Sequence, residues 1–153
     1  MAKYLLDTNA CIGIRNSFRG VQSKDSARRA AQAKLIARWK AMPAADLAMS
    51  FITLGELRVW VEKHASRTAA LALLQQVTHA VQVIGCPTGA PGTDNMAEHY
   101  ANIRATLEST GKGIDDNDLW IAAHARALGL TVVTNNLSHF GRVPALATED
   151  WTV

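Results

Sequence analysis

Four polar side chains stand where short apolar segments of this chain end or begin. They are Asp7, Glu56, Asp118 and Asn136. If the apolar segments are parallel strands of one sheet and the helices that follow them, these side chains share the carboxyl edge of that sheet, where ligands bind in such folds. A cluster built from oxygen atoms suits Mg²⁺ or Mn²⁺ rather than zinc. Such an ion polarises a phosphate and lowers the pKa of a bound water, so the pattern predicts phosphoryl chemistry.

Each of these residues also has a purely structural interpretation. Asp7 suits the N-cap of a following helix. The sequence Thr53-Leu54-Gly55-Glu56 fits a capping box, with Thr53 as the N-cap and Glu56 reaching back to its N–H. Asn136 suits a turn. A structural role alone explains each residue separately, and only their common position favours a shared site.

Three carboxylates crowd the start of the apolar stretch 118–128. Asp115, Asp116 and Asp118 lie within four residues. A helix N-terminus favours one or two acids, but three repel one another. A bound cation would relieve that repulsion, and without one we expect a raised pKa for at least one carboxyl group.

The composition describes a globular chain. Its 153 residues are 48% apolar and 19% charged, which fits one domain over 1–153 and excludes wholesale disorder. No apolar run approaches the ~18–20 residues of a membrane span, and the N-terminus does not resemble a signal peptide. Cys11 and Cys86 form no CxxC motif. We therefore expect a reduced, cytoplasmic protein without membrane contact.

Apolar periodicity predicts strands that alternate with helices. Strands are expected at 3–6, 47–51, 81–84, 130–134 and near 147–151, and helices at 27–42, 54–65, 71–77, 96–107 and 118–128. The segment 85–92 is rich in Gly and Pro and is expected to be a loop. Gly129 fits the C′ position of a helix. The alternation predicts an α/β fold with a largely parallel central sheet and helices on both faces.

Several motifs, taken in order, resemble the PIN-domain ribonucleases, and most closely the VapC-type toxins of toxin–antitoxin pairs. The motifs are LLDTN at 5–9, ITLGEL at 52–57, GI-x-x-NDLWIAAHA at 113–125, VTNN at 133–136, HFGRVPAL at 139–146 and EDW at 149–151. The resemblance implies a three-layer PIN fold and cleavage of RNA that depends on Mg²⁺ or Mn²⁺. It also implies a small VapB-like antitoxin, a toxin homodimer and a toxin–antitoxin hetero-oligomer.

The resemblance also assigns the site residues. Asp7, Glu56 and Asp118 match three family acids, and all three would be catalytic and bind the metal. Asn136 falls at the fourth acidic position and is the fourth catalytic residue that the resemblance implies, although it supplies no charge and can only hydrogen-bond a metal-bound water. Asp115 or Asp116 could compensate for it, and Asp116 is a possible further metal ligand. The missing fourth acid leaves an alternative open, in which the chain is an inactive PIN-like module that binds RNA or protein.

Charge is unevenly distributed behind the net value of +3. Residues 15–40 contain eight basic side chains and one acid, so the rest of the chain is net acidic. A charge run is usually a solvated helix face. Beside a nuclease site it would instead bind the RNA backbone, so Arg28, Arg29 and Arg38 are candidate RNA contacts. His124 is expected in the core, and His139 at the surface or against RNA.

Overall fold

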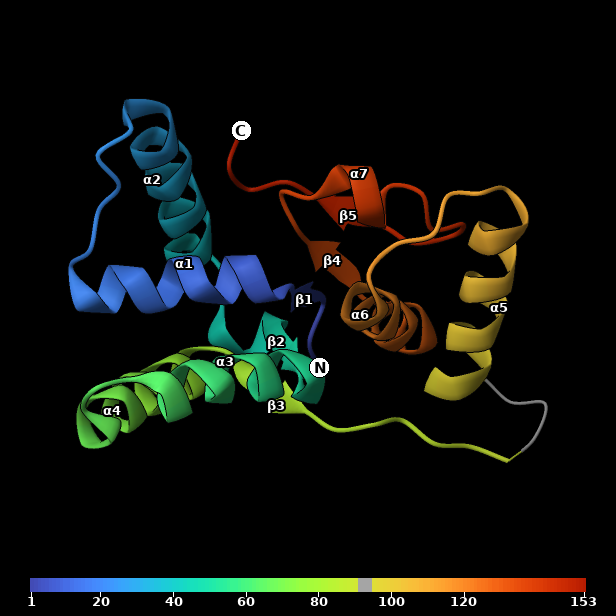
Figure 1. Cartoon of the computed structure of the whole chain (residues 1–153), viewed down its shortest axis with the longest axis horizontal. Coiled ribbons are helices and arrows are strands. Elements are labelled where there is room, and N and C mark those ends of the chain that lie inside the picture. Colours follow the sequence, from blue (N-terminus) through green and yellow to red (C-terminus); the bar gives the residue numbers. More distant parts are fainter. Residues whose placement is uncertain (91–94) are drawn as a thin grey trace.

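A five-stranded parallel sheet forms the centre of the molecule (Figure 1). The computed structural model describes residues 1–90 and 95–153. The strand order is β3-β2-β1-β4-β5, and the strands are β1 (Tyr4–Leu6), β2 (Leu47–Ser50), β3 (Gln82–Ile84), β4 (Thr131–Val133) and β5 (Thr148–Glu149). In the register of the sheet, Leu5 pairs with Ala48 on one side and with Val132 on the other. Both the expected strands and their parallel arrangement are confirmed.

Alternate residues of the central strands point into two separate cores. Leu6, Met49 and Val133 pack with apolar residues of α1 (Thr8–Arg19), α2 (Ser26–Ala41), α3 (Phe51–Lys63) and α4 (Arg67–Ala80). Leu5, Ala48 and Val132 pack on the opposite face, against α5 (Met96–Ser109), α6 (Asp116–Leu128) and α7 (Leu137–Phe140). Since both faces of the sheet carry helices, the structure is the predicted three-layer α/β/α sandwich.

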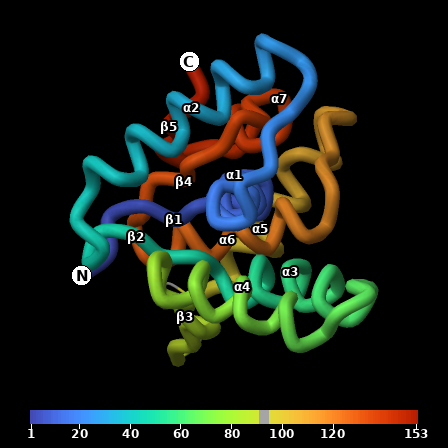
Figure 2. Tube along the Cα trace, turned by 90° about the vertical axis from the view of Figure 1, so that its left-hand side faces the viewer, coloured from blue at the N-terminus to red at the C-terminus, as the bar shows by residue number. Residues whose placement is uncertain are grey.

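Asp7 is the N-cap of the first helix, α1, which matches its structural interpretation, but the sequence pattern predicted no residue range for this helix. Residues 15–40 form one basic run in the sequence, whereas Gly20 ends α1 with a left-handed φ of 66° and a second helix, α2, begins at Ser26. Viewed from the side, α1 lies end-on between α2 and the α3–α4 pair (Figure 2). The basic stretch 15–40 is therefore divided between two helices with different surroundings.

Two helix starts also differ from the sequence-based expectation. Helix α3 begins at Phe51, because Ser50 is its N-cap and its Oγ accepts from the N–H of Ile52 at 3.2 Å. The predicted N-cap at Thr53 is therefore wrong. Helix α6 begins at Asp116 rather than Asp118, with Asp115 as its N-cap. Gly129 ends α6 in the left-handed conformation, as predicted.

The remaining expectations on local structure are largely met. Residues 85–90 of the expected loop belong to no helix or strand, and the rest of that loop lies outside the described residues. Cys11 is buried, Cys86 is exposed, and both are free thiols. Among the residues described, none of the helices combines the length and apolar character needed to cross a membrane.

Candidate active site

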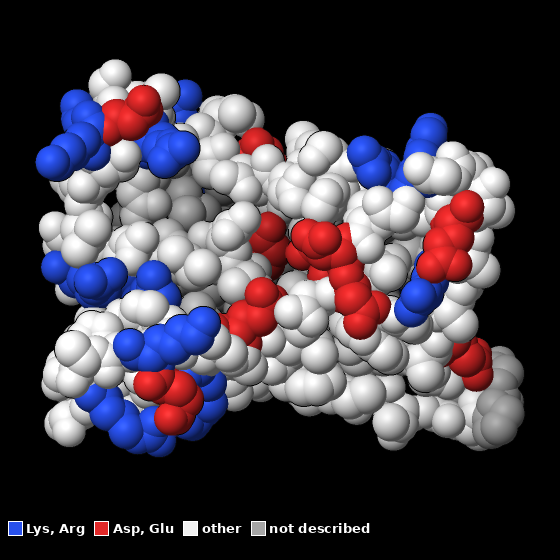
Figure 3. All heavy atoms as spheres, viewed as in Figure 1, with Lys and Arg blue, Asp and Glu red and all other residues white. Residues whose placement is uncertain are grey.

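Acidic side chains from three separate segments meet at the carboxyl edge of the sheet. Asp7 follows β1, Glu56 lies in the second turn of α3, and Asp118 lies in the first turn of α6. Asp7 is close enough to the other two that the negative charges of Asp118 and Glu56 both raise its pKa. Acidic side chains gather near the middle of this face, with basic side chains over its left-hand part (Figure 3). The predicted grouping of the three acids is thus present in the fold.

Asp7 is the most buried of these acids. Only 3% of the residue is exposed. Burial raises its pKa from 3.8 to about 6, although hydrogen bonds from the Thr134 side chain and the Ala10 N–H oppose that rise. Its Oδ1 accepts from the Ala10 N–H at 2.8 Å, so Asp7 also caps α1. A buried carboxylate surrounded by other acids favours a neutralising cation.

Glu56 does not form the predicted capping box. Its Oε1 instead accepts a hydrogen bond of 2.7 Å from the hydroxyl of Thr8, the first residue of α1. The Thr8 hydroxyl also lies 3.1 Å from the Thr53 hydroxyl. These contacts hold the Glu56 carboxylate at the carboxyl edge of the sheet instead of at the backbone of its own helix. The structure therefore favours the functional interpretation of Glu56 over the structural one.

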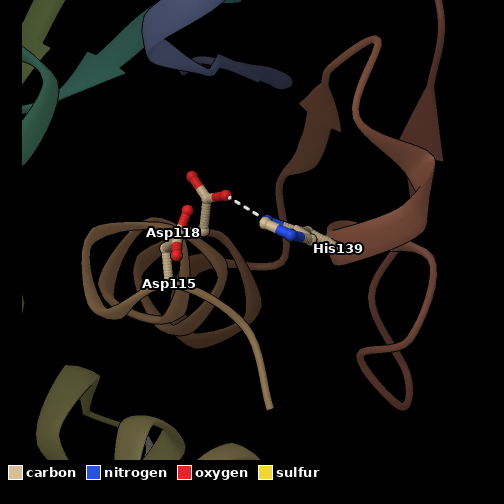
Figure 4. Close-up of side chains that lie close together, drawn as sticks. All are labelled: Asp115, Asp118 and His139. Atoms are coloured by element: carbon tan, nitrogen blue, oxygen red, sulfur yellow. Dashed lines mark hydrogen bonds and ion pairs between the residues drawn. The ribbon is translucent and has the colours of Figure 1, made fainter. Parts of the chain in front are cut away.

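Asp118 belongs to a second group of possible ligands (Figure 4). Its Oδ2 lies 2.8 Å from Nδ1 of His139, a residue of the short helix α7. Asp115, Asp118 and His139 place one ligand atom each within 4.8 Å of one another. The first two residues lie at the N-terminus of α6, where the helix dipole also favours negative charge. Two carboxylates and an imidazole in this arrangement can hold a divalent cation.

His139 is the site residue that sequence reasoning missed. His139 belongs to the HFGRVPAL motif of the family resemblance. The sequence around a single histidine in a loop does not indicate which residue it contacts. The partner, Asp118, is 21 residues away in sequence. Thr134 was also missed, although it stands in the VTNN motif beside the predicted Asn136.

Two other predicted site residues have local partners. Asp116 accepts a hydrogen bond from the Tyr100 hydroxyl, and its Oδ1 lies 4.0 Å from the Arg104 guanidinium. The Asn136 side chain accepts from the Ser138 hydroxyl at 2.7 Å. Its backbone N–H donates to the Thr134 hydroxyl at 2.9 Å, and Thr134 in turn hydrogen-bonds Asp7. The structure thus favours Asp115 over Asp116 as the additional acid.

The three candidate RNA contacts on α2 differ in their contacts within the protein. Arg38 pairs with Glu149 at 3.1 Å, and its guanidinium lies 5.5 Å from the centre of the Trp151 ring. Arg29 donates to the carbonyls of Ser23 and Lys24, which anchors the segment before α2. Arg28 is exposed. Of the three, Arg28 has the side chain most available to a ligand.

His124 has the core position expected for it. The residue is 0% exposed, and its Nδ1 lies 2.8 Å from the Ser50 hydroxyl. Burial lowers its pKa, so the ring is neutral at pH 7. This histidine supports the junction of β2 and α3 and is not part of the acidic site.

Comparison with known proteins defines the class to which this fold and site belong. The family model of the PIN domain matches residues 4–146. The chain therefore belongs to the PIN-domain family, as its motifs and its three-layer fold indicated.

Individual relatives narrow the comparison to VapC proteins. The chain is 34% identical over 151 residues to Ribonuclease VapC2 of Haemophilus influenzae, covering 99% of both chains. It is 32% identical to the tRNA(fMet)-specific endonuclease VapC of Shigella flexneri, covering 99% of this chain and 100% of that protein. Its fold matches the crystal structure of DNA-bound VapBC from Salmonella typhimurium with a TM-score of 0.78, at 32% identity and 99% coverage of each chain.

Proposed function

We propose that this protein is a metal-dependent endoribonuclease and the toxin of a toxin–antitoxin pair. The observation that carries the proposal is the grouping of Asp7, Glu56 and Asp118 at one edge of the sheet in a PIN-domain chain. VapC relatives similar over the full chain are named ribonucleases or endonucleases. The single unit 1–153 would carry the activity in the cytoplasm, as a homodimer and in a hetero-oligomer with its antitoxin.

The residues present fit a resident Mg²⁺ or Mn²⁺. Asp7 and Asp118 would hold it, Glu56 would bind it directly or through water, and Asp115 and His139 would complete the donor set. When bound, the ion supplies positive charge that polarises the scissile phosphate and makes water a better nucleophile at neutral pH. The raised pKa of Asp7 supports this assignment, because within the described residues that carboxylate has no positively charged partner.

The protein's own residues position these groups. The Thr8 hydroxyl orients Glu56, and the Thr134 hydroxyl and the Ala10 N–H orient Asp7. His139 orients Asp118 through the 2.8 Å contact between its Nδ1 and Asp118 Oδ2. Asn136 acts through its backbone N–H on Thr134 and, in this proposal, is a positioning residue. Exposed cations such as Arg28 would hold the RNA backbone outside the acidic pocket.

Asp7→Asn tests the activity. Asn retains the N-cap of α1 but removes the charge, so we expect a folded variant that has lost RNA cleavage by at least a hundredfold. The assay uses purified toxin without antitoxin, Mg²⁺ or Mn²⁺, and mapping of the RNA ends. Wild-type activity in the variant would contradict the proposal. No cleavage by the wild type under these conditions would favour the alternative, an inactive binding module.

The antitoxin is a separate part of the proposal. VapBC complexes share this fold, so a VapB-like protein is the expected partner. Co-expression with the neighbouring small reading frame should yield a stable complex in which cleavage is suppressed. Free toxin and complex, compared by size-exclusion chromatography and by cleavage of the same RNA, would establish both points.

A further inference from the structure

Arg15 on α1 is a nearly buried cation that pairs with no anion in the part of the chain that the structure describes. Only 9% of the residue is exposed. Its Nε is buried without a hydrogen-bond partner, and its Nη2 makes one long hydrogen bond, 3.4 Å, to Asn16 Oδ1. Within residues 1–90 and 95–153, no carboxylate lies within ion-pairing distance of its guanidinium. Burying a charge is costly unless it is paired, so this arrangement calls for an anionic partner from outside the chain.

An aromatic ring and a second cation complete the surroundings of Arg15. Its guanidinium carbon lies 4.2 Å from the centre of the Trp60 ring on α3, and that of Arg19 lies 5.6 Å from the same ring. Arg19 is exposed, and its charge lowers the pKa of Arg15 together with burial. Stacking on Trp60 holds the Arg15 guanidinium by its face. Because its Nε is buried, a ligand would bind Arg15 through the terminal Nη groups. Two like charges held together in this way favour an anion between them.

Arg15 and Arg19 lie along the same contact between α1 and α3 that positions Glu56 in the acidic site. Helices α1 and α3 touch through Thr8 and Glu56 at one end and through Arg15 and Trp60 further along. Thr8 and Arg15 are seven residues apart, which places them on one face of α1 and roughly 10 Å apart along its axis. Figure 3 shows basic side chains beside the acidic centre on this face. A polyanion bound at the carboxylates would therefore extend to Arg15 and Arg19, the neighbouring cations.

We propose that Arg15 and Arg19, held by Trp60, form a phosphate-binding subsite for the RNA backbone next to the cleavage site. This inference rests on the proposed ribonuclease function. The subsite would bind a backbone phosphate of the RNA other than the scissile one. The planar fork of Arg matches phosphate oxygens bidentately. Trp60 is a positioning residue, since it acts through the two arginines. The subsite differs from the basic residues of α2, where Arg29 and Arg38 already have partners within the fold.

Binding without cleavage tests the subsite. A fluorescent single-stranded RNA that the wild type cleaves is titrated with proteins that all carry Asp7→Asn, in Mg²⁺ and at several salt concentrations. Arg19→Ala should raise Kd roughly tenfold and lower the salt slope by about 0.7, as loss of one single-strand phosphate contact does. Lys3→Ala removes an equal charge at the opposite end of the sheet, where Lys3 pairs with Asp46, and should change neither quantity.

Arg15 and Trp60 are tested with variants that separate binding from folding. Arg15→Met replaces the buried charge by an apolar side chain, so the Tm should stay level or rise while RNA binding weakens roughly tenfold or more. Trp60→Phe keeps an aromatic face and should bind RNA within about threefold of the parent, whereas Trp60→Leu should weaken binding as Arg19→Ala does. A structural role alone would give a lower Tm for Arg15→Met and no rescue by Phe.

The possible outcomes distinguish the inference from the function on which it rests. If the wild type cleaves RNA but the Arg15, Arg19 and Trp60 variants bind it as tightly as the parent, the subsite is overturned and the ribonuclease function stands. If those variants bind RNA normally but lose the antitoxin complex, the anion is an acidic segment of a protein partner and the inference is again overturned. If the wild type neither binds nor cleaves RNA, both proposals fail.

Discussion

The Thr8 hydroxyl donates a 2.7 Å hydrogen bond to Glu56, which joins the first turn of α1 to the second turn of α3. This bond orients a carboxylate that would otherwise be free to rotate. Thr8→Val keeps the shape of the side chain but removes the donor, so we expect cleavage to fall about tenfold with little change in Tm. Thr8→Ser retains the hydroxyl and should stay close to wild type. Equal rates for the Val and Ser variants would show that this bond has no part in the activity.

The buried carboxyl of Asp7 predicts a specific pH dependence of stability in metal-free protein. Its pKa is about 6 in the fold, above the ordinary 3.8, so folding favours its protonated form. The stabilisation, at most about 3 kcal/mol, is complete below pH 4 and is lost as pH rises through 6. Asp7→Asn is neutral throughout, so the variant should exceed wild type in free energy of unfolding above pH 6 but not below pH 4. Urea unfolding with EDTA from pH 4 to 8 measures this, and parallel profiles would contradict it.

The contact between His139 and Asp118 predicts an effect on metal affinity. His139→Ala should weaken Mn²⁺ binding by ten- to a hundredfold, because the imidazole either binds the ion or orients the carboxylate that does. Isothermal titration with Mn²⁺ gives the affinity without relying on activity. His79→Ala on α4 changes a histidine far along the chain from the cluster and serves as the control. An unchanged Mn²⁺ affinity in His139→Ala would remove His139 from the site.

The two neighbouring acids of α6 make opposite predictions. Asp115 shares the ligand cluster, so Asp115→Asn should weaken both Mn²⁺ binding and cleavage. Asp116 instead bonds Tyr100, so Asp116→Asn should leave Mn²⁺ affinity within about twofold and lower stability by no more than about 1 kcal/mol. The pair differs by one position and by no net charge, which makes each variant the control of the other. A larger loss of metal affinity in Asp116→Asn would reverse the assignment.

The basic face of α2 is separately predicted to contribute to RNA binding. Replacing Arg28 and Arg29 together should weaken RNA binding and flatten its salt dependence, since each phosphate contact adds about 0.7 to the slope. Arg29 also anchors Ser23 and Lys24, so Arg28→Ala alone separates the charge from that structural contact. Fluorescence anisotropy at several salt concentrations measures both variants. An unchanged slope would identify this helix face as solvated surface.

Much of the fold could be predicted because its signals are local. Short apolar runs gave the strands, and their alternation with helical patterns gave the parallel sheet. The Thr53 capping box failed because Ser50, three residues earlier, is the N-cap of α3 and accepts from the Ile52 N–H, while Glu56 accepts from Thr8. Local sequence cannot decide between two N-cap candidates three residues apart when the choice depends on where the preceding strand ends.

The sequence predicts the acidic residues of the candidate site but not the residues that contact them. Asp7, Glu56 and Asp118 follow from the rule that polar residues collect at the carboxyl edge of a parallel sheet. His139 could not be assigned in this way, because its contact with Asp118 depends on how α7 packs beside α6. Arg15 likewise appeared only as one charge in a basic run. Its burial and its contact with Trp60 depend on the packing of α1 against α3, which the sequence pattern did not separate from α2.

The parallel pairing of β1 with β4 has a consequence for when this protein becomes active. Tyr4 pairs with Thr131, so the two central strands come from opposite ends of the chain. Contacts between residues so far apart in sequence form late in folding. During synthesis, Asp7 and Glu56 emerge long before Asp118 and His139. The proposed metal site therefore cannot assemble on the ribosome before the segment through His139 has left the exit tunnel.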